Sequence, residues 1–265
     1  MDGRELKRIW RSGQVSFGAW VALTDPLATT ALCDAGYEWL MIDAEHRPFD
    51  AETLRTLIAT MRCRGVLPLV RVRANDEAII KQAFDLGAEG VAVPVIRSVE
   101  DAKRAVAFSR LPPLGARGCG PNDAAEFYAN RDSYLAHLDD NHVLILWIEH
   151  IGAVNQLDQI LTLPGVDALV LGPVDLTYSM GLPWQISHPQ VQAAIETTVS
   201  KAVAAHMPVG ISVTAEDSES WRAKGVNILF LGTDLEFILH GGAAARNRLC
   251  QATGRPGVQF RARAW

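Results

Sequence analysis

The sequence predicts a (β/α)₈ barrel, in which eight parallel strands alternate with helices and close into a ring. Short apolar runs rich in β-branched residues alternate with longer amphipathic stretches along almost the whole chain, which is typical of a parallel sheet with helical connections. Runs such as Val143–Leu146 are apolar at every position, as expected for strands that are buried on both faces. The length of 265 residues suits a single barrel domain.

The apolar runs define eight expected strands, most of them bounded by residues that favour turns. They are Val15–Leu23, Trp39–Asp43, Leu67–Val72, Gly90–Pro94, Val143–Glu149, Ala168–Gly172, Val209–Val213 and Ile228–Gly232. Eight strand–helix units fit a closed barrel better than an open sheet. A doubly wound sheet is the alternative architecture for the same alternation.

Helical periodicity between the strands predicts eight helices. They are Pro26–Ala35, Ala51–Arg62, Glu77–Leu86, Val99–Ser109, Ala153–Leu161, Gln190–Ala205, Glu216–Lys224 and Leu235–Leu249. Gly36 and Gly87 directly follow two of these helices, at the position where a helix often ends in a left-handed residue that glycine tolerates best. These glycines support the expected helix boundaries.

Two segments depart from the regular alternation. Residues 111–141 form a long insertion that is rich in proline and glycine and then includes a short expected helix. A loop of this length usually covers a site or forms an oligomer contact. Residues 250–265 form a short tail with several arginines, which is either disordered or packed on a partner. We therefore expect one domain over residues 1–265 that ends in this tail.

Composition argues against several classes of partner. The chain carries 25 basic and 30 acidic residues, a net charge of −5, which disfavours nucleic acid and anionic membranes. Residues 1–11 contain no apolar signal-peptide stretch, and no apolar run reaches the roughly 18 residues of a membrane span. We expect a cytoplasmic protein. The cysteines are scattered without a C-x-x-C pair, so no zinc ribbon is expected.

Polar side chains gather at the carboxyl ends of the expected strands, where the active sites of such barrels lie. In chain order they are Asp43, His46, Arg71, Glu149 and Asp175. Glu149 and Asp175 follow adjacent strands and can approach each other. Two neighbouring carboxylates repel unless a cation lies between them, and Mg²⁺ or Mn²⁺ prefers such oxygen ligands. The alternative is that each carboxylate caps a helix or pairs with an arginine.

His46 and Arg71 are the other candidates for chemistry at this end of the barrel. His46 lies in a loop where a general base would be placed, and Asp43 or Asp85 could orient its imidazole. Its alternative role is a structural hydrogen bond. The planar guanidinium of Arg71 suits a carboxylate ligand, and its alternative role is a salt bridge at the barrel rim. No lysine falls on an expected strand, which argues against a Schiff-base mechanism.

An ordered series of motifs resembles the HpcH/HpaI aldolase family over roughly residues 15 to 250. The motifs are Asp43-Ala44-Glu45-His46, Val70-Arg71-Val72, Gly87-Ala88-Glu89-Gly90-Val91 with Val93-Pro94, Pro112-Pro113 with Gly115 and Arg117-Gly118, Ile148-Glu149, Pro164-Gly165-Val166-Asp167, and Gly172-Pro173-Val174-Asp175-Leu176. Each motif is weak alone, and their common order makes the set specific.

The resemblance implies a barrel lyase that reversibly cleaves a 4-hydroxy-2-oxo acid to pyruvate and an aldehyde. The implied cofactor is a divalent metal (Mg²⁺, Mn²⁺ or Co²⁺), with Glu149 and Asp175 as its ligands. Arg71 matches the residue that binds the pyruvate carboxylate, and His46 matches the catalytic base.

The same resemblance implies further catalytic carboxylates and an assembly. Asp43 and Asp85 match the carboxylate neighbours of His46, one of which can act across a subunit interface. The family usually forms hexamers in which the last helix is exchanged between neighbours, so a homo-hexamer is expected.

Three bulky residues depart from the family pattern near the expected active site. Trp147 stands where glutamine is usual, Arg47 replaces a usual glycine, and Phe49 enlarges the same loop. We expect the substrate, a small 2-oxo acid, to contact Arg47, Arg71, Trp147, Gly172, Pro173 and Val174. The bulky residues leave open an enzyme that decarboxylates oxaloacetate or joins its enolate to an unusual acceptor. A third alternative is a barrel that only binds a ligand.

Overall fold

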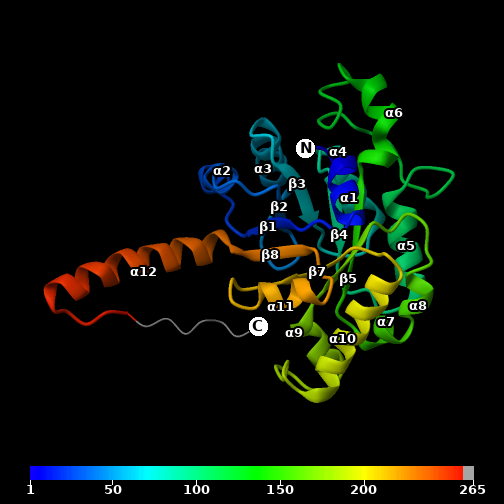
Figure 1. Cartoon of the computed structure of the whole chain (residues 1–265). Helices are drawn as coiled ribbons and strands as arrows, with labels where there is room; N and C mark the ends of the chain where they lie inside the picture. Colours follow the sequence, from blue (N-terminus) through cyan, green and yellow to red (C-terminus); the bar gives the residue numbers. More distant parts are fainter. Residues whose placement is uncertain (259–265) are drawn as a thin grey trace.

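A computed structural model describes residues 1–258, which form a closed barrel of eight parallel strands surrounded by helices (Figure 1). Each strand pairs with its sequence neighbour, and β8 pairs with β1 to close the ring. The strands are β1 (Ser16–Val21), β2 (Trp39–Asp43), β3 (Leu67–Arg71), β4 (Gly90–Val93), β5 (Val143–Ile148), β6 (Ala168–Leu171), β7 (Val209–Ser212) and β8 (Ile228–Thr233). The closed ring confirms the predicted fold class and excludes the doubly wound sheet.

Helices connect the strands on the outside of the ring. They are α1 (Gly3–Arg11), α2 (Pro26–Asp34), α3 (Ala51–Cys63), α4 (Glu77–Asp85), α5 (Val99–Ser109), α6 (Arg131–Asn141), α7 (Ile151–Asn155), α8 (Leu157–Ile160), α9 (Pro173–Ser179), α10 (Pro189–Ala204), α11 (Ser218–Ala223) and α12 (Asp234–Thr253). The side chains of Asp25, Asp50 and Asp76 cap α2, α3 and α4 by accepting backbone N–H groups. These caps explain why the predicted starts of the three helices agree with the structure.

Four helical features differ from the prediction. The segments of α1 and α9 are not predicted to be helical, and both helices are short enough that tertiary packing stabilises them more than their own propensity does. The single helix predicted at Ala153–Leu161 is instead α7 and α8, which divide at Gln156. α12 continues to Thr253, so the expected tail begins as helix. The last part of that tail, residues 259–265, lies outside the described residues.

Side chains of the strands alternate between two separate cores. One core fills the space between the strands and the surrounding helices. The other fills the inside of the ring, where Trp20, Trp39, Trp147 and Phe230 are its large aromatic members. The interior of the ring is therefore filled by side chains.

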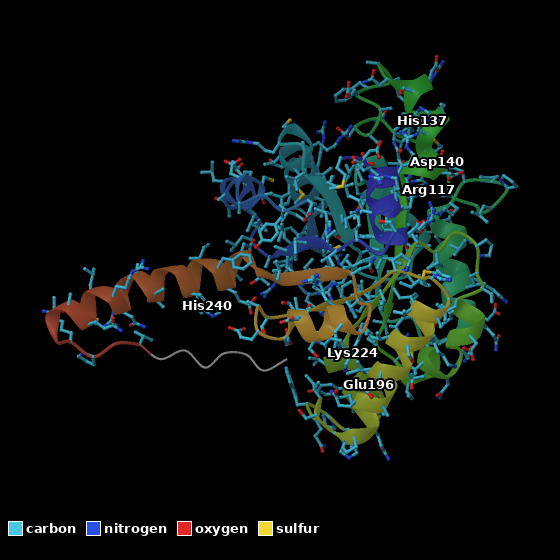
Figure 2. The ribbon with its side chains drawn as sticks, viewed as in Figure 1. Arg117, His137, Asp140, Glu196, Lys224 and His240 are labelled. Carbon is cyan, nitrogen blue, oxygen red and sulfur yellow. The ribbon has the colours of Figure 1, made fainter. Side chains whose placement is uncertain are left out.

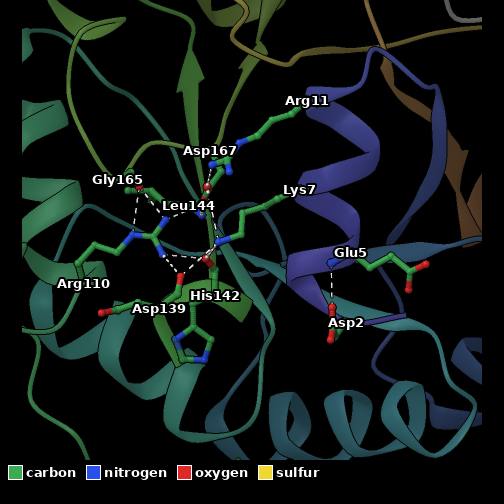
Figure 3. Close-up of polar contacts among 10 residues, drawn as sticks. All are labelled: Asp2, Glu5, Lys7, Arg11, Arg110, Asp139, His142, Leu144, Gly165 and Asp167. Carbon is green, nitrogen blue, oxygen red and sulfur yellow. Dashed lines mark hydrogen bonds and ion pairs between the residues drawn. The ribbon is translucent and has the colours of Figure 1, made fainter. Parts of the chain in front are cut away.

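Asp167, just before β6, is a buried carboxylate that joins several segments (Figure 3). Its Oδ2 accepts hydrogen bonds from Arg110 Nη2 at 2.5 Å and from the backbone N–H of Leu144 at 2.9 Å. Its Oδ1 accepts a hydrogen bond from Arg11 Nη2 at 3.0 Å and lies 3.7 Å from Lys7 Nζ. This carboxylate therefore ties α1 and the end of α5 to strands β5 and β6.

The insertion after α5 attaches to the barrel through a buried polar stack around His142. The His142 imidazole lies over the Phe84 ring with a centroid distance of 4.3 Å. Its Nδ1 lies 3.1 Å from Arg117 Nη2 and its Nε2 lies 3.3 Å from Tyr134 Oη. Burial, together with the nearby Arg117 cation, holds the pKa of His142 well below its ordinary value. The neutral ring can accept a hydrogen bond from Arg117 at Nδ1 and donate one to Tyr134 from Nε2.

The last helix, α12, projects away from the barrel (Figure 1). It begins with a capping box between Thr233 and Glu236. Along its length the apolar side chains of Leu235, Ile238, Leu239 and Leu249 are exposed. Neither α12 nor any other helix within residues 1–258 combines the length and the apolarity needed to cross a membrane.

Replacing Asp167 with asparagine is expected to destabilise the fold strongly. The substitution keeps the shape of the side chain but removes the negative charge that three cations share. Breaking a buried ion pair in this way costs about 3–5 kcal/mol, which urea unfolding followed by circular dichroism would measure. Asp158→Asn is the control, because Asp158 pairs with Lys201 at the exposed surface, where an ion pair contributes at most about 1 kcal/mol. Equal losses in the two variants would contradict the role of Asp167.

The lowered pKa of His142 predicts a specific acid sensitivity. Below about pH 6.5 the unfolded chain binds a proton at this histidine that the folded protein does not. The contribution to stability is therefore present above that pH and lost as the pH falls toward the folded-state pKa. Relative to His142→Gln, the wild type should lose up to about 1.4 kcal/mol per pH unit between roughly pH 6.5 and 5. Urea unfolding at several pH values would test this, with the exposed His137→Gln as control, and a pH-independent difference would refute it.

Candidate active site

A cavity of about 310 Å³ opens at the carboxyl ends of the strands. Ten of the residues singled out from the sequence line it, namely Asp43, His46, Arg47, Arg71, Trp147, Glu149, Gly172, Pro173, Val174 and Asp175. The barrel brings these residues together from distant parts of the sequence because all the strand ends meet at one mouth. Asp85 is the predicted site residue that does not line this cavity.

Arg71, at the end of β3, is buried and held by two carboxylates from the end of β2. Its Nη2 and Nε lie 2.8 and 3.1 Å from Asp43 Oδ1, and its Nε lies 3.3 Å from Glu45 Oε2. The strand register places Asp43 directly opposite Arg71, so this ion pair follows from the order of the strands. The alternative role of Arg71, a salt bridge at the rim, is thus realised. Its Nη1 donates to no group within residues 1–258, so the guanidinium can also bind a ligand.

His46 lies in the loop after β2, and its side chain is 56% exposed. Its backbone N–H donates a hydrogen bond to Asp43 Oδ1 at 3.2 Å, while its imidazole Nε2 lies 3.5 Å from Glu45 Oε2. Asp43 thus contacts the backbone of His46 rather than its imidazole in this chain, and the expected role of Asp43 or Asp85 in orienting the ring stays a prediction. Glu45 lies between the imidazole and the Arg71 guanidinium.

Glu149, directly after β5, is a buried carboxylate. Its Oε1 accepts a hydrogen bond of 2.6 Å from the backbone N–H of Val95. Val95 has a φ of 53°, a left-handed conformation that is strained for a β-branched residue. Burial raises the pKa of Glu149 to about 8, and the neighbouring carboxylates Glu45 and Asp175 add to the increase. The anionic form of Glu149 therefore lacks a sufficient positive partner.

The turn from β6 into α9 packs closely against Glu149. Gly172 is the N-cap of α9 and Pro173 opens the helix, where a missing N–H costs no hydrogen bond. A Cβ atom at Gly172 would lie 2.7 Å from Glu149 Cβ and 2.9 Å from Trp147 Nε1, so the approach requires glycine. Asp175 lies in the first turn of α9, where the helix dipole favours a carboxylate.

The mouth of the barrel carries more negative than positive charge. Glu45, Glu149 and Asp175 influence one another electrostatically, and burial raises the pKa of Glu45 as well. A divalent cation between Glu149 and Asp175 would relieve this repulsion, and hard cations prefer such oxygen ligands. No metal-binding group of three or more His, Cys, Asp or Glu occurs within residues 1–258. Glu149 and Asp175 are thus a pair of oxygen donors of the kind that such a cation prefers.

Asp85 lies at the opposite end of the barrel, where α4 ends shortly before β4 begins. Its Oδ1 accepts a hydrogen bond of 3.4 Å from the backbone N–H of Gly120 in the insertion. Burial raises its pKa, and Arg117 partly offsets the increase. Figure 2 shows Arg117 on the same side of the molecule as His137 and Asp140, away from His240 on α12. Within one chain Asp85 therefore cannot act on His46.

Aromatic residues that the sequence analysis does not single out form the floor of the cavity. Trp20 of β1 and Phe230 of β8 line it, and their ring centroids are 5.0 Å apart. Trp147 lies 5.5 Å from Trp20 and 5.6 Å from Phe230. The sequence could have indicated these residues, because side chains alternate along a strand and an aromatic side chain near its carboxyl end can therefore point into the barrel.

Comparison with known proteins relates this chain to a known family. The family model for HpcH/HpaI aldolase/citrate lyase matches residues 16–241. The 5-keto-4-deoxy-D-glucarate aldolase of Shigella dysenteriae serotype 1 is 34% identical over 232 residues, which cover 87% of this chain and 91% of that protein. The 2-keto-3-deoxy-L-rhamnonate aldolase of Escherichia coli K12 is 32% identical over 231 residues, 86% of each protein.

A solved structure supports the same relationship. The crystal structure of a HpcH/HpaI aldolase/citrate lyase family protein from Burkholderia cenocepacia J2315 matches this chain with a TM-score of 0.88 and 30% sequence identity. The match covers 93% of this chain and 99% of that one. The similarity therefore extends over the whole barrel.

Proposed function

This chain belongs to the HpcH/HpaI aldolase/citrate lyase family and is a carbon–carbon lyase of the aldolase type, and we propose that it reversibly cleaves a 4-hydroxy-2-oxo acid to pyruvate and an aldehyde. One observation carries the proposal. The buried guanidinium of Arg71 lines the same cavity as the carboxylates of Glu149 and Asp175, which could bind a cation. A 2-oxo acid carries a carboxylate next to a keto oxygen. The Arg71 Nη1 group suits the carboxylate, and the Glu149 side of the cavity suits the keto oxygen.

Glu149 and Asp175 would hold the divalent cation, with Mg²⁺, Mn²⁺ or Co²⁺ as candidates. When bound, such a cation supplies Lewis acidity that stabilises negative charge on the keto oxygen of the substrate. Arg71 supplies a fixed positive charge beside the same group, because Asp43 and Glu45 hold its guanidinium in place. Preorganisation of this kind removes the cost of rearranging dipoles during the reaction.

His46 is the proposed base. The imidazole takes the proton of the 4-hydroxyl group, the oxygen at C4 becomes the aldehyde carbonyl, and the electron pair of the C3–C4 bond passes into the enolate of pyruvate. The protonated imidazole then gives the proton to C3, which completes pyruvate, and the same transfers run backwards in the aldol direction. Glu45 lies 3.5 Å from His46 Nε2 and stabilises the protonated ring. We place the rest of the substrate against the Gly172-Pro173-Val174 turn, with Arg47 at the rim of the cavity.

We further propose that copies of the chain assemble into a hexamer through α12. The exposed apolar side chains of Leu235, Ile238 and Leu239 support this proposal, since a projecting helix with such a surface is stabilised when a second copy covers it. Asp85 also supports this proposal, because assembly could bring its carboxylate to the mouth of the barrel of another copy.

Pyruvate release should depend on a divalent cation and on Glu149. After chelation the enzyme should release no pyruvate from a racemic 4-hydroxy-2-oxo acid, and Mg²⁺, Mn²⁺ or Co²⁺ should restore the activity. Glu149→Ala should lower kcat/KM at least roughly a thousandfold, because the cation loses one of two protein ligands. Coupling to lactate dehydrogenase measures the pyruvate.

Glu196→Ala is the matched control, because Glu196 pairs with Lys224 at the surface and does not line the cavity. It should retain the wild-type rate. Metal-independent pyruvate release, or full activity of Glu149→Ala, would refute the proposed mechanism. Consumption of oxaloacetate without any aldol cleavage would favour the decarboxylase alternative.

Assembly through α12 should be sensitive to charge on its apolar surface. Ile238→Glu places a carboxylate on that surface and should lower the mass measured by light scattering, whereas Gln251→Glu on an exposed part of the same helix should not. The expected wild-type mass is that of six chains of 28.9 kDa. Identical masses for wild type and Ile238→Glu would contradict an assembly through α12.

A further inference from the structure

Trp147, on the floor of the cavity, lies close to both Arg71 and Glu149. Trp147 extends from β5 and Trp20 from β1, on opposite sides of the ring, and their centroids meet 5.5 Å apart. The Arg71 guanidinium rests on both rings, with Cζ 4.4 Å from the Trp20 centroid and 5.2 Å from the Trp147 centroid. Two aromatic faces therefore support the cation from one side while Asp43 and Glu45 hold its edge.

The indole N–H of Trp147 has no hydrogen-bond acceptor within residues 1–258, although the side chain is 97% buried. Trp10 and Trp39, deeper in the same core, both donate from Nε1 to Ser16 Oγ, at 2.7 and 3.0 Å. A buried indole N–H normally has such a partner. Trp147 lines the cavity instead, and its Nε1 is not among the side-chain atoms that are both fully buried and unpartnered, so this N–H is open to a ligand in the cavity.

The position of Trp147 Nε1 indicates which part of a bound ligand could accept its hydrogen bond. A Cβ atom at Gly172 would lie 2.9 Å from Trp147 Nε1 and 2.7 Å from Glu149 Cβ. The indole thus has its N–H end beside Glu149 and Gly172 and its ring face beside Arg71. A ligand that spans the distance between Arg71 and Glu149 passes over this N–H.

We propose that Trp147 donates a hydrogen bond from Nε1 to an oxygen of the bound 2-oxo acid, and that its ring positions Arg71 for the same ligand. This inference rests on the proposed function and adds a substrate-binding donor to it. An N–H fixed in a water-poor site strengthens its bond as the acceptor oxygen gains negative charge. The ring face contributes by cation–π attraction, which is strongest where the cation is desolvated.

Two substitutions separate these roles. Trp147→Phe keeps an aromatic face beside Arg71 and removes the N–H, so kcat should fall roughly 10- to 100-fold while KM changes little. Trp147→Gln removes the ring and keeps an amide N–H donor, so kcat should recover relative to Trp147→Phe while KM rises. Trp221→Phe is the matched control, because Trp221 lies beside Lys224 outside the cavity.

The experiment measures pyruvate release with Mg²⁺ for the full chain, and calorimetric binding of oxalate with Mg²⁺ as a readout that needs no turnover. Oxalate is a planar dianion that resembles the enolate of pyruvate, in which the negative charge has already developed, so its affinity should fall roughly tenfold in Trp147→Phe. Thermal unfolding of each variant verifies that it is folded.

The outcomes distinguish this inference from the proposed function. An active wild type whose Trp147→Phe variant keeps its kcat and its oxalate affinity within about twofold would overturn the role of Trp147 alone. A wild type that binds oxalate but releases no pyruvate would overturn the proposed reaction. Loss of kcat in Trp147→Phe with recovery in Trp147→Gln would establish the donor.

Discussion

The carboxylates of Asp43, Glu45, Glu149 and Asp175 share the mouth of this barrel with the buried guanidinium of Arg71, and the interactions among these charges constrain the residues around them. Charges interact several times more strongly there than in water because the surroundings are partly apolar. Arg71 neutralises Asp43 and Glu45 on one side of the cavity. On the other side Glu149 accepts a hydrogen bond from the Val95 backbone N–H, but its burial still raises its pKa to about 8. The cation that we propose would therefore lie on the Glu149 side, and Arg71 would remain for an anionic ligand.

The closed ring of strands holds these charged groups in place. Because every strand is hydrogen-bonded on both sides, the strand ends cannot move apart to relieve the repulsion. The inner core adds a rigid aromatic floor of Trp20, Trp147 and Phe230 beneath the guanidinium. Gly172 lets the turn after β6 approach Glu149 closely. Charged groups stabilise a reacting oxygen most effectively when they are held rigidly in place, as they are here.

The two ends of the barrel serve different purposes. At the amino ends of the strands, Asp167 and His142 join α1 and the insertion to the ring through buried polar contacts. At the carboxyl ends the polar groups are incompletely paired and face a cavity. Pairing at the amino ends is also incomplete, since Arg117 Nε and Nη1 have no hydrogen-bond partner within residues 1–258, so the two ends differ in the cavity that the carboxyl-end groups line. Asp85 lies at the amino ends, so a catalytic role for it depends on assembly.

The sequence by itself determined the alternation of strands and helices, the barrel, and the residues at the strand ends, because those features depend on local periodicity and on one general rule about where strands finish. That rule placed Asp43, Arg71, Glu149 and Asp175 at one mouth without any coordinates. Only the tertiary structure decided that Glu45 faces His46 and that Trp20, Trp147 and Phe230 meet across the ring. These contacts depend on side-chain directions and on strand register around a closed ring, which bring together residues that have no relation along the chain.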